Sequence, residues 1–175
     1  MRAWQKWLFR GGAALVGVVG AVVLVAVAAE EGPLVGAAHD EAPDVRAYAA
    51  AEKKLVEHFG VDVREHTVTL NEPALRVHVL ELPGAGTPVV LLHGGGSMLA
   101  GWMPLVPHLK GRHLFLVDRP GCGLSDGFDY VDVDLRRHAV DFVTGVLDGL
   151  GVQRALFVAN SMGALWSTWF AIEHP

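Results

Sequence analysis

Apolar and polar residues follow two different rhythms in the middle of the chain, and each rhythm predicts a kind of strand. From Arg64 to Leu70 and from Leu75 to Leu82 the two kinds of residue alternate, and Asn71-Glu72-Pro73 separates these segments. This pattern predicts an antiparallel hairpin with one solvated face. Continuous apolar runs predict three further, buried strands over Pro88–Leu92, His113–Val117 and Ala155–Ala159.

Segments with a helical spacing of apolar residues follow these three strands. They cover Leu99–Leu109, Asp132–Leu150 and Ser161–Pro175. A hairpin followed by alternating strands and helices predicts an α/β fold, with a parallel sheet flanked by helices. Reactive groups of such a sheet are expected at the carboxyl ends of its strands, where His93, Asp118 and Ser161 fall.

Residues 30–60 precede this domain, which we place over residues 61–175. The segment Glu30–Pro43 is small, polar and acidic, which is typical of a linker. A helix is predicted from Asp44, its cap, to a stop at Gly60, with one loose apolar face. That face would either pack on the domain or lie on a membrane surface.

Residues 1–29 have a pattern typical of membrane targeting. Gly11–Ala29 contains no charged residue and is nearly long enough to span a bilayer as a hydrophobic helix. Three basic residues precede it: Arg2, Lys6 and Arg10. The segment is either an uncleaved anchor or a signal peptide that is cut after Ala28. The domain is then expected outside the cytoplasm, anchored to the membrane in the first case and secreted in the second.

Composition excludes several other classes of protein. The formal net charge is −5 and no basic stripe is present, so nothing indicates a nucleic-acid partner. Cys122 is the only cysteine, which excludes an intramolecular disulfide and a zinc site built on cysteines. The nine histidines are scattered without the spacing of metal ligands, so we expect neither a metal nor another cofactor.

The segment Asn160-Ser161-Met162-Gly163 joins the last predicted strand to the last predicted helix. A serine on such a sharp turn is lifted clear of the sheet, and small residues two positions before and after it allow the bend. Its hydroxyl would lie at the positive end of the helix, where developing negative charge is favoured. Ser161 is therefore a candidate nucleophile, and the alternative is a plain helix cap.

Together with His93-Gly94-Gly95-Gly96 and the run Asp118–Asp126, this turn resembles the α/β-hydrolase fold family, in its branch of single-domain serine hydrolases. The resemblance covers about Arg64 to Pro175. It implies that Ser161 attacks the carbonyl carbon of a small ester-like substrate. One departure is Ala159, which occupies a position where the family usually has glycine.

The resemblance also implies roles for the residues around Ser161. The backbone amide of Met162 would be one donor of the oxyanion hole, and that of Gly95 the second, with Gly96 as the alternative. His93 would order the glycine loop rather than act as a base.

In this family the catalytic acid and histidine follow the serine along the chain. Glu173 and His174 lie on the helix that leaves the turn, more than about 15 Å from the Ser161 hydroxyl at ~1.5 Å per residue, so they do not serve. We therefore expect residues 61–175 to be the N-terminal part of a hydrolase, truncated after the nucleophile, with little activity alone. The alternatives are a hydrolase of carbon–carbon bonds and an inactive, membrane-tethered binding protein; the oligomeric state stays open.

Overall fold

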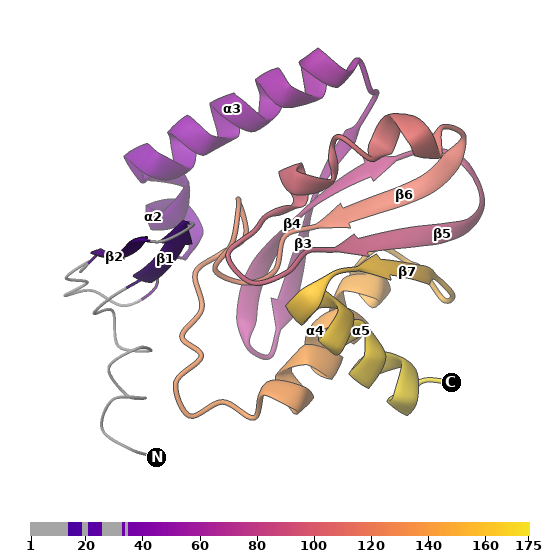
Figure 1. The fold of residues 1–175 in the computed structure, drawn as a ribbon. Coiled ribbons are helices and arrows are strands. Elements are labelled where there is room, and N and C mark those ends of the chain that lie inside the picture. Colours follow the sequence, from indigo (N-terminus) through magenta and orange to yellow (C-terminus); the bar gives the residue numbers. More distant parts are fainter. Residues whose placement is uncertain (1–13, 19–20, 26–32, 34) are drawn as a thin grey trace.

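The computed structural model of the chain describes residues 14–18, 21–25, 33 and 35–175. Its centre is a five-stranded sheet in the order β3-β4-β6-β5-β7 (Figure 1). The strands are β3 (Arg64–Asn71), β4 (Ala74–Leu82), β5 (Ala85–Leu92), β6 (Arg112–Val117) and β7 (Leu156–Ala159). β4 pairs antiparallel with β3 and β6, whereas β5 pairs parallel with β6 and β7. The predicted hairpin followed by parallel strands is confirmed, but its predicted solvated face holds only for β3, because β4 lies between β3 and β6 with core on both faces. The strand predicted as buried over Ala155–Ala159 is instead the edge strand β7, in which Leu156 and Val158 are exposed.

Helices cover both faces of the sheet. On one face lie α4 (Leu135–Gly149) and α5 (Ser161–Glu173), and the opposite face carries α3 (Pro43–Phe59) and two short 3-10 helices (Figure 1). Alternation along the strands divides the core accordingly. In β4, Val77 and Val79 join the core under α4 and α5, and Leu80 and Leu82 join the core on the other face.

The helix predicted over Leu99–Leu109 is wrong. The segment forms two separate 3-10 turns, η1 (Leu99–Trp102) and η2 (Val106–Leu109). Pro104 lies between the turns and Pro107 lies inside the second. Because proline has no amide hydrogen to donate and its ring clashes with the preceding turn, one continuous α-helix cannot form.

Helix α3 packs on the domain, which decides between the two interpretations of its apolar face. Leu55, Val56 and Phe59 lie against the core on that side of the sheet. The helix ends at Gly60, whose left-handed backbone (φ 59°) is the predicted stop. The predicted cap is wrong: Ala42 is the N-cap and Asp44 lies in the first turn, because Pro43 is well suited to the first helical position.

The hydrophobic helix predicted within residues 1–29 is not observed. The part that the structure describes forms two antiparallel strands, β1 (Ala14–Val18) and β2 (Ala21–Val25). Five of the ten residues in these strands are valine, whose branched side chain favours strands over helices. None of the helices in the described ranges is long and apolar enough to cross a bilayer. The remaining residues of 1–29 lie outside the described residues, and the location outside the cytoplasm stays a prediction.

The predicted linker Glu30–Pro43 contains a helix, α2 (Gly36–Glu41).

Candidate active site

The turn between β7 and α5 presents Ser161 to solvent. Asn160 is extended (φ −128°, ψ 151°) and Ser161 adopts a positive φ of 49°. Residues other than glycine seldom adopt such a left-handed backbone, because Cβ approaches the carbonyl oxygen too closely. Among the described residues only Asp132 and Ser161 do so without being glycine. The sharp strand-to-helix bend inferred from the sequence is therefore present at the predicted nucleophile.

Gly163 allows α5 to approach β5 closely. A Cβ atom built on this residue would lie 2.6 Å from the backbone oxygen of His93 and would also overlap the backbone oxygen of Leu92. Any larger side chain would have to push the first turn of α5 away from the end of β5. The small residue at this position therefore fixes where the helix that carries Ser161 begins.

The glycine loop after β5 lies directly against this turn. Gly94 is buried, and a Cβ atom on it would be 3.1 Å from both Asn160 Oδ1 and Ser161 Cβ. Gly95 and Gly96 are exposed, with open space where their side chains would be. The structure thus brings the predicted oxyanion loop beside the predicted nucleophile.

Met162 lies in the first turn of α5, where backbone amides have no partner within the helix. The first amide of the turn that bonds back is that of Ala164, which donates to the oxygen of Asn160 at 3.3 Å. The Met162 amide therefore lies next to the serine as a donor that helix formation leaves free.

His93 is buried and neutral. Its Nδ1 donates to the Gly94 oxygen (2.8 Å), and its Nε2 accepts from the Arg119 amide (3.0 Å). Burial, together with the nearby charge of Arg119, lowers the pKa of His93 to about 4. Nε2 also lies 3.7 Å from Asp118 Oδ1, but a ring nitrogen that accepts a hydrogen bond carries no proton, so this is no ion pair. These contacts suit the predicted ordering role and leave His93 no free nitrogen for a base.

Arg119 is a site residue that the sequence analysis did not single out. Its Nε donates to the His93 oxygen (3.0 Å) and its Nη2 to the Gly94 oxygen (2.8 Å). Its guanidinium carbon lies 4.9 Å from the ring centre of Trp166 on α5. A second charged residue directly after Asp118, at the end of a buried apolar strand, was the available signal, since such a residue must find partners inside the fold.

Asp118 has a structural role in the same region. Its carboxylate accepts the amides of Leu99 (2.7 Å) and Leu124 (3.1 Å), which ties η1 to the loop after β6. Gly123, with φ 57°, leaves room for this carboxylate. Burial raises the pKa of Asp118 to about 7. Cys122 in the same loop has its thiol pKa raised by burial, which does not favour a reactive thiolate.

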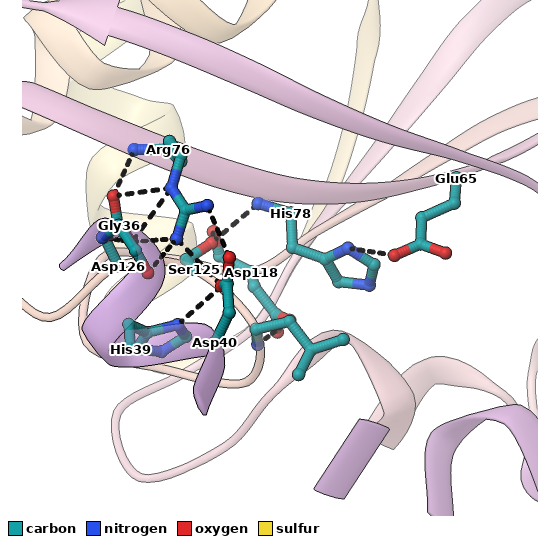
Figure 2. A network of polar contacts seen from close by, with 10 residues as sticks. Gly36, His39, Asp40, Glu65, Arg76, His78, Asp118, Ser125 and Asp126 are labelled. Atoms are coloured by element: carbon teal, nitrogen blue, oxygen red, sulfur yellow. Dashed lines mark hydrogen bonds and ion pairs between the residues drawn. The ribbon is translucent and has the colours of Figure 1, made fainter. Parts of the chain in front are cut away.

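A buried polar cluster joins α3 to the sheet behind this loop. His78 Nε2 contacts Glu52 Oε1 at 2.8 Å, and ligand atoms of Glu52, His78 and Asp118 lie within 4.8 Å of one another. Residues of these types can hold a metal ion, although Glu52 and His78 already satisfy each other. Burial acts to lower the pKa of His78, but the hydrogen bond and charge of Glu52 raise it overall. Figure 2 shows His78 between Asp118 and Glu65, whose Oε1 lies 3.5 Å from Nδ1.

A second cluster, also in Figure 2, attaches α2 to the loop after β6. The Arg76 guanidinium pairs with Asp40 (2.7 Å) and with Asp126 (2.8 Å) and donates to the Gly36 oxygen (2.8 Å). Burial acts against the charge of Asp126, but the hydrogen bonds from Arg76 hold its pKa below the usual value. The N-terminal helices are therefore connected by charge to the loop that carries Asp118 and Arg119.

Within the described part of the chain, the Ser161 hydroxyl forms no hydrogen bond to a base. His174 stacks on Phe170 (ring centres 4.7 Å apart), and Glu173 pairs with Arg136 (3.1 Å). Both residues are thus engaged at the far end of α5, as their spacing from Ser161 predicts. The described residues thus bring the predicted nucleophile and the predicted oxyanion loop together, and none of them is placed to accept a proton from Ser161.

Comparisons with known proteins agree with this arrangement. Residues 87–175 match the family described as the alpha/beta hydrolase fold. The chain is 36% identical over 118 residues to a 2-hydroxy-6-oxo-6-phenylhexa-2,4-dienoate hydrolase of Burkholderia cepacia, covering 62% of this chain and 40% of the relative. It is 37% identical over 102 residues to a pimeloyl-[acyl-carrier protein] methyl ester esterase of Legionella pneumophila (strain Corby), covering 58% and 38%. The chain spans about two fifths of the length of these curated relatives.

Among solved structures, carboxylesterase CesB of Bacillus subtilis superposes with a TM-score of 0.65 at 19% identity, covering 77% of this chain and 47% of that one. At this level of identity the similarity concerns the fold alone.

Proposed function

Because the chain belongs to the alpha/beta hydrolase fold family, we propose that it is a serine hydrolase whose nucleophile is Ser161. The observation that carries the proposal is the exposed serine at a left-handed turn, with the glycine loop packed against it. The substrate is a small molecule with an ester-like carbonyl group. No cofactor is needed for this chemistry.

In the proposed reaction the Ser161 hydroxyl oxygen adds to the carbonyl carbon, and negative charge develops on the carbonyl oxygen. The amides of Met162 and Gly95 donate to that oxygen, with Gly96 as the alternative second donor. Losing one such donor typically costs ~3 kcal/mol of transition-state stabilisation. The proton removed from the serine passes to the leaving oxygen, which departs as an alcohol while the acyl-enzyme forms. Water then hydrolyses the acyl-enzyme, which releases the acid and returns a proton to the serine oxygen.

The serine proton needs an acceptor, and His93 does not supply it because both of its ring nitrogens are engaged. Following the family's order of serine, acid and histidine, we propose that the acceptor and its acidic partner come after Pro175.

A second candidate is the hydrolysis of a carbon–carbon bond next to a ketone. The observation that favours it is the similarity to relatives named as dienoate hydrolases, which reaches 38% identity in the Comamonas testosteroni proteins. Both candidates require the same serine and the same amides, so they differ in substrate rather than in the site described above.

The test is labelling with a fluorophosphonate probe, located by mass spectrometry, on the 175-residue chain and on a chain extended past Pro175. We expect Ser161 to be labelled in the extended chain, and Ser161→Ala to abolish labelling. Thr168→Ala, which removes an exposed hydroxyl of the same helix, is the matched control and should label normally. The rates at which the extended chain hydrolyses p-nitrophenyl butyrate, an ester, and 2-hydroxy-6-oxo-6-phenylhexa-2,4-dienoate, a carbon–carbon bond substrate, are then compared. The faster reaction shows which of the two candidates holds. Absence of labelling in both chains would refute the proposal and favour an inactive binding protein.

A further inference from the structure

We propose that Arg119 is a positioning residue that sets the peptide unit between Gly94 and Gly95, so that the Gly95 amide is presented to the oxygen that develops charge. The inference deepens the proposed function and rests on it. According to this inference, the buried guanidinium of Arg119 orients one oxyanion donor without touching the substrate.

The geometry begins with the Gly94 oxygen, which accepts two hydrogen bonds. Arg119 Nη2 donates to it at 2.8 Å, and His93 Nδ1 donates to it at 2.8 Å. Arg119 Nε also holds the preceding carbonyl, that of His93, at 3.0 Å. Two successive carbonyl groups of the glycine loop therefore point towards one side chain.

Peptide planarity transmits this constraint to the next amide. In a trans peptide the C=O of Gly94 and the N–H of Gly95 lie in one plane and point in opposite directions. Fixing the Gly94 oxygen towards Arg119 and His93 thus turns the Gly95 N–H away from them. Gly95 has open space around it, and the adjoining Gly94 lies against Ser161 Cβ. The Gly95 amide is consequently directed away from Arg119 and His93, on a loop that packs against the turn with Ser161.

The charge of Arg119 acts in the same direction. A carbonyl that accepts from a cation is polarised, and its peptide N–H becomes a stronger donor. The guanidinium is buried, and among the ion pairs of the described residues none joins it to a carboxylate. A buried positive charge without a counterion is costly in the resting protein but favours negative charge that develops close to it.

Arg119 also contacts the helix that carries the nucleophile. Trp166 on α5 is fully buried, and its ring lies 4.9 Å from the guanidinium carbon. One side chain therefore touches both halves of the site, the loop with Gly95 and the helix that begins at Ser161. Loss of the guanidinium should disturb their relative position rather than substrate binding.

The kinetic test compares Arg119→Met, Arg119→Lys and the control Arg137→Met in the extended chain that labels at Ser161. Arg137 is an exposed arginine of α4 that pairs with Asp141 on the surface. We expect Arg119→Met to lower kcat and the rate of fluorophosphonate labelling by about 100-fold, the loss typical of one oxyanion donor, with little change in KM. Arg119→Lys should recover part of the rate, and added guanidinium should partly rescue Arg119→Met. A wild-type kcat in Arg119→Met would overturn the inference. So would a rise in KM as large as the loss of kcat, if added guanidinium does not restore the rate.

A measurement that needs no activity separates this inference from the proposed function. Nuclear magnetic resonance can follow the amide proton of Gly95. In Arg119→Met its chemical shift should change and its exchange with solvent should be faster, compared with the wild-type chain and with Arg137→Met. If Ser161 never labels, the proposed function fails, and this resonance still decides the role of Arg119: an unchanged Gly95 amide overturns it. Should Arg119→Met not fold, Arg119→Lys replaces it in both measurements, and wild-type values for that variant overturn the inference.

Discussion

The buried, neutral state of His93 makes the stability of the fold depend on pH in a way that can be isolated. The pKa of His93 falls from 6.5 to about 4 on folding, because the ring is buried and its nitrogens are occupied. Between these two values the unfolded chain binds a proton that the folded protein does not, so acidification favours unfolding. Lowering the pH from 7.5 to 4.5 should cost about 2.5 kcal/mol of unfolding free energy from this residue alone.

Asp118 contributes with the opposite sign. Its pKa rises to about 7 on folding, so its contribution to stability is lost as the pH rises from 3.8 towards 7. The pKa values of Asp40, Glu81, Asp126, His78 and His138 are shifted as well, so the overall pH profile mixes several effects and a comparison of variants is needed to isolate that of His93. We propose to measure urea unfolding at pH 4.5 and pH 7.5 for the wild-type chain, His93→Asn and the exposed control His108→Asn. Tryptophan fluorescence would report the unfolding.

His93→Asn is expected to be less stable than the wild type at pH 7.5, since it loses the ring that holds Gly94 and Arg119. Its further loss on acidification should be smaller than that of the wild type by about 2.5 kcal/mol. The control should lose as much as the wild type. Parallel losses in His93→Asn and the wild type would refute the assignment of a neutral, buried imidazole.

Three further outcomes are expected from other parts of the structure. Gly163→Ala should displace the start of α5 from Leu92. The rate at which Ser161 is labelled should fall by about 100-fold, and the free energy of unfolding should fall by about 1–3 kcal/mol. Labelling at the wild-type rate would contradict the close approach of α5 to β5. Glu52→Gln should cost about 3 kcal/mol in urea unfolding by leaving His78 without its charged partner. Because Glu52 raises the pKa of His78, the stability from their pairing is present below pH 6.5 and lost as the pH rises through the raised value, so the effect of Glu52→Gln should shrink at pH 9.

The central sheet could be predicted from the sequence because its strands have strong and distinct periodicities. Alternation in β3 reflects one solvated face, and the apolar runs that end β5 and β6 reflect burial on both faces, whereas β4 alternates in sequence and is nevertheless buried on both faces. The two wrong helix predictions have local causes that are visible in the sequence. These causes are the proline between η1 and η2 and the density of valine in β1 and β2. The spacing of apolar residues in the first case, and the length of the uncharged apolar run in the second, was given more weight than the conformational preference of the residues themselves.

The site was only partly accessible to sequence reasoning. Ser161 and the glycine loop are defined by short local motifs, whereas the side chain of Arg119 contacts His93 and Gly94, 26 and 25 positions away. The pair of Arg76 and Asp126 spans 50 positions and depends on how β4 meets the loop after β6. Partners of this kind follow from the order of strands in the sheet, which periodicity within a segment does not reveal.

The left-handed backbone at Ser161 has a consequence for how this position can vary. A residue with a Cβ atom in that conformation costs the fold on the order of 1 kcal/mol relative to glycine. We therefore expect Ser161→Gly to gain stability on this order while it loses the hydroxyl oxygen that the proposed function requires. The most reactive position proposed for this chain would then also be one where the wild-type residue is not the most stable choice.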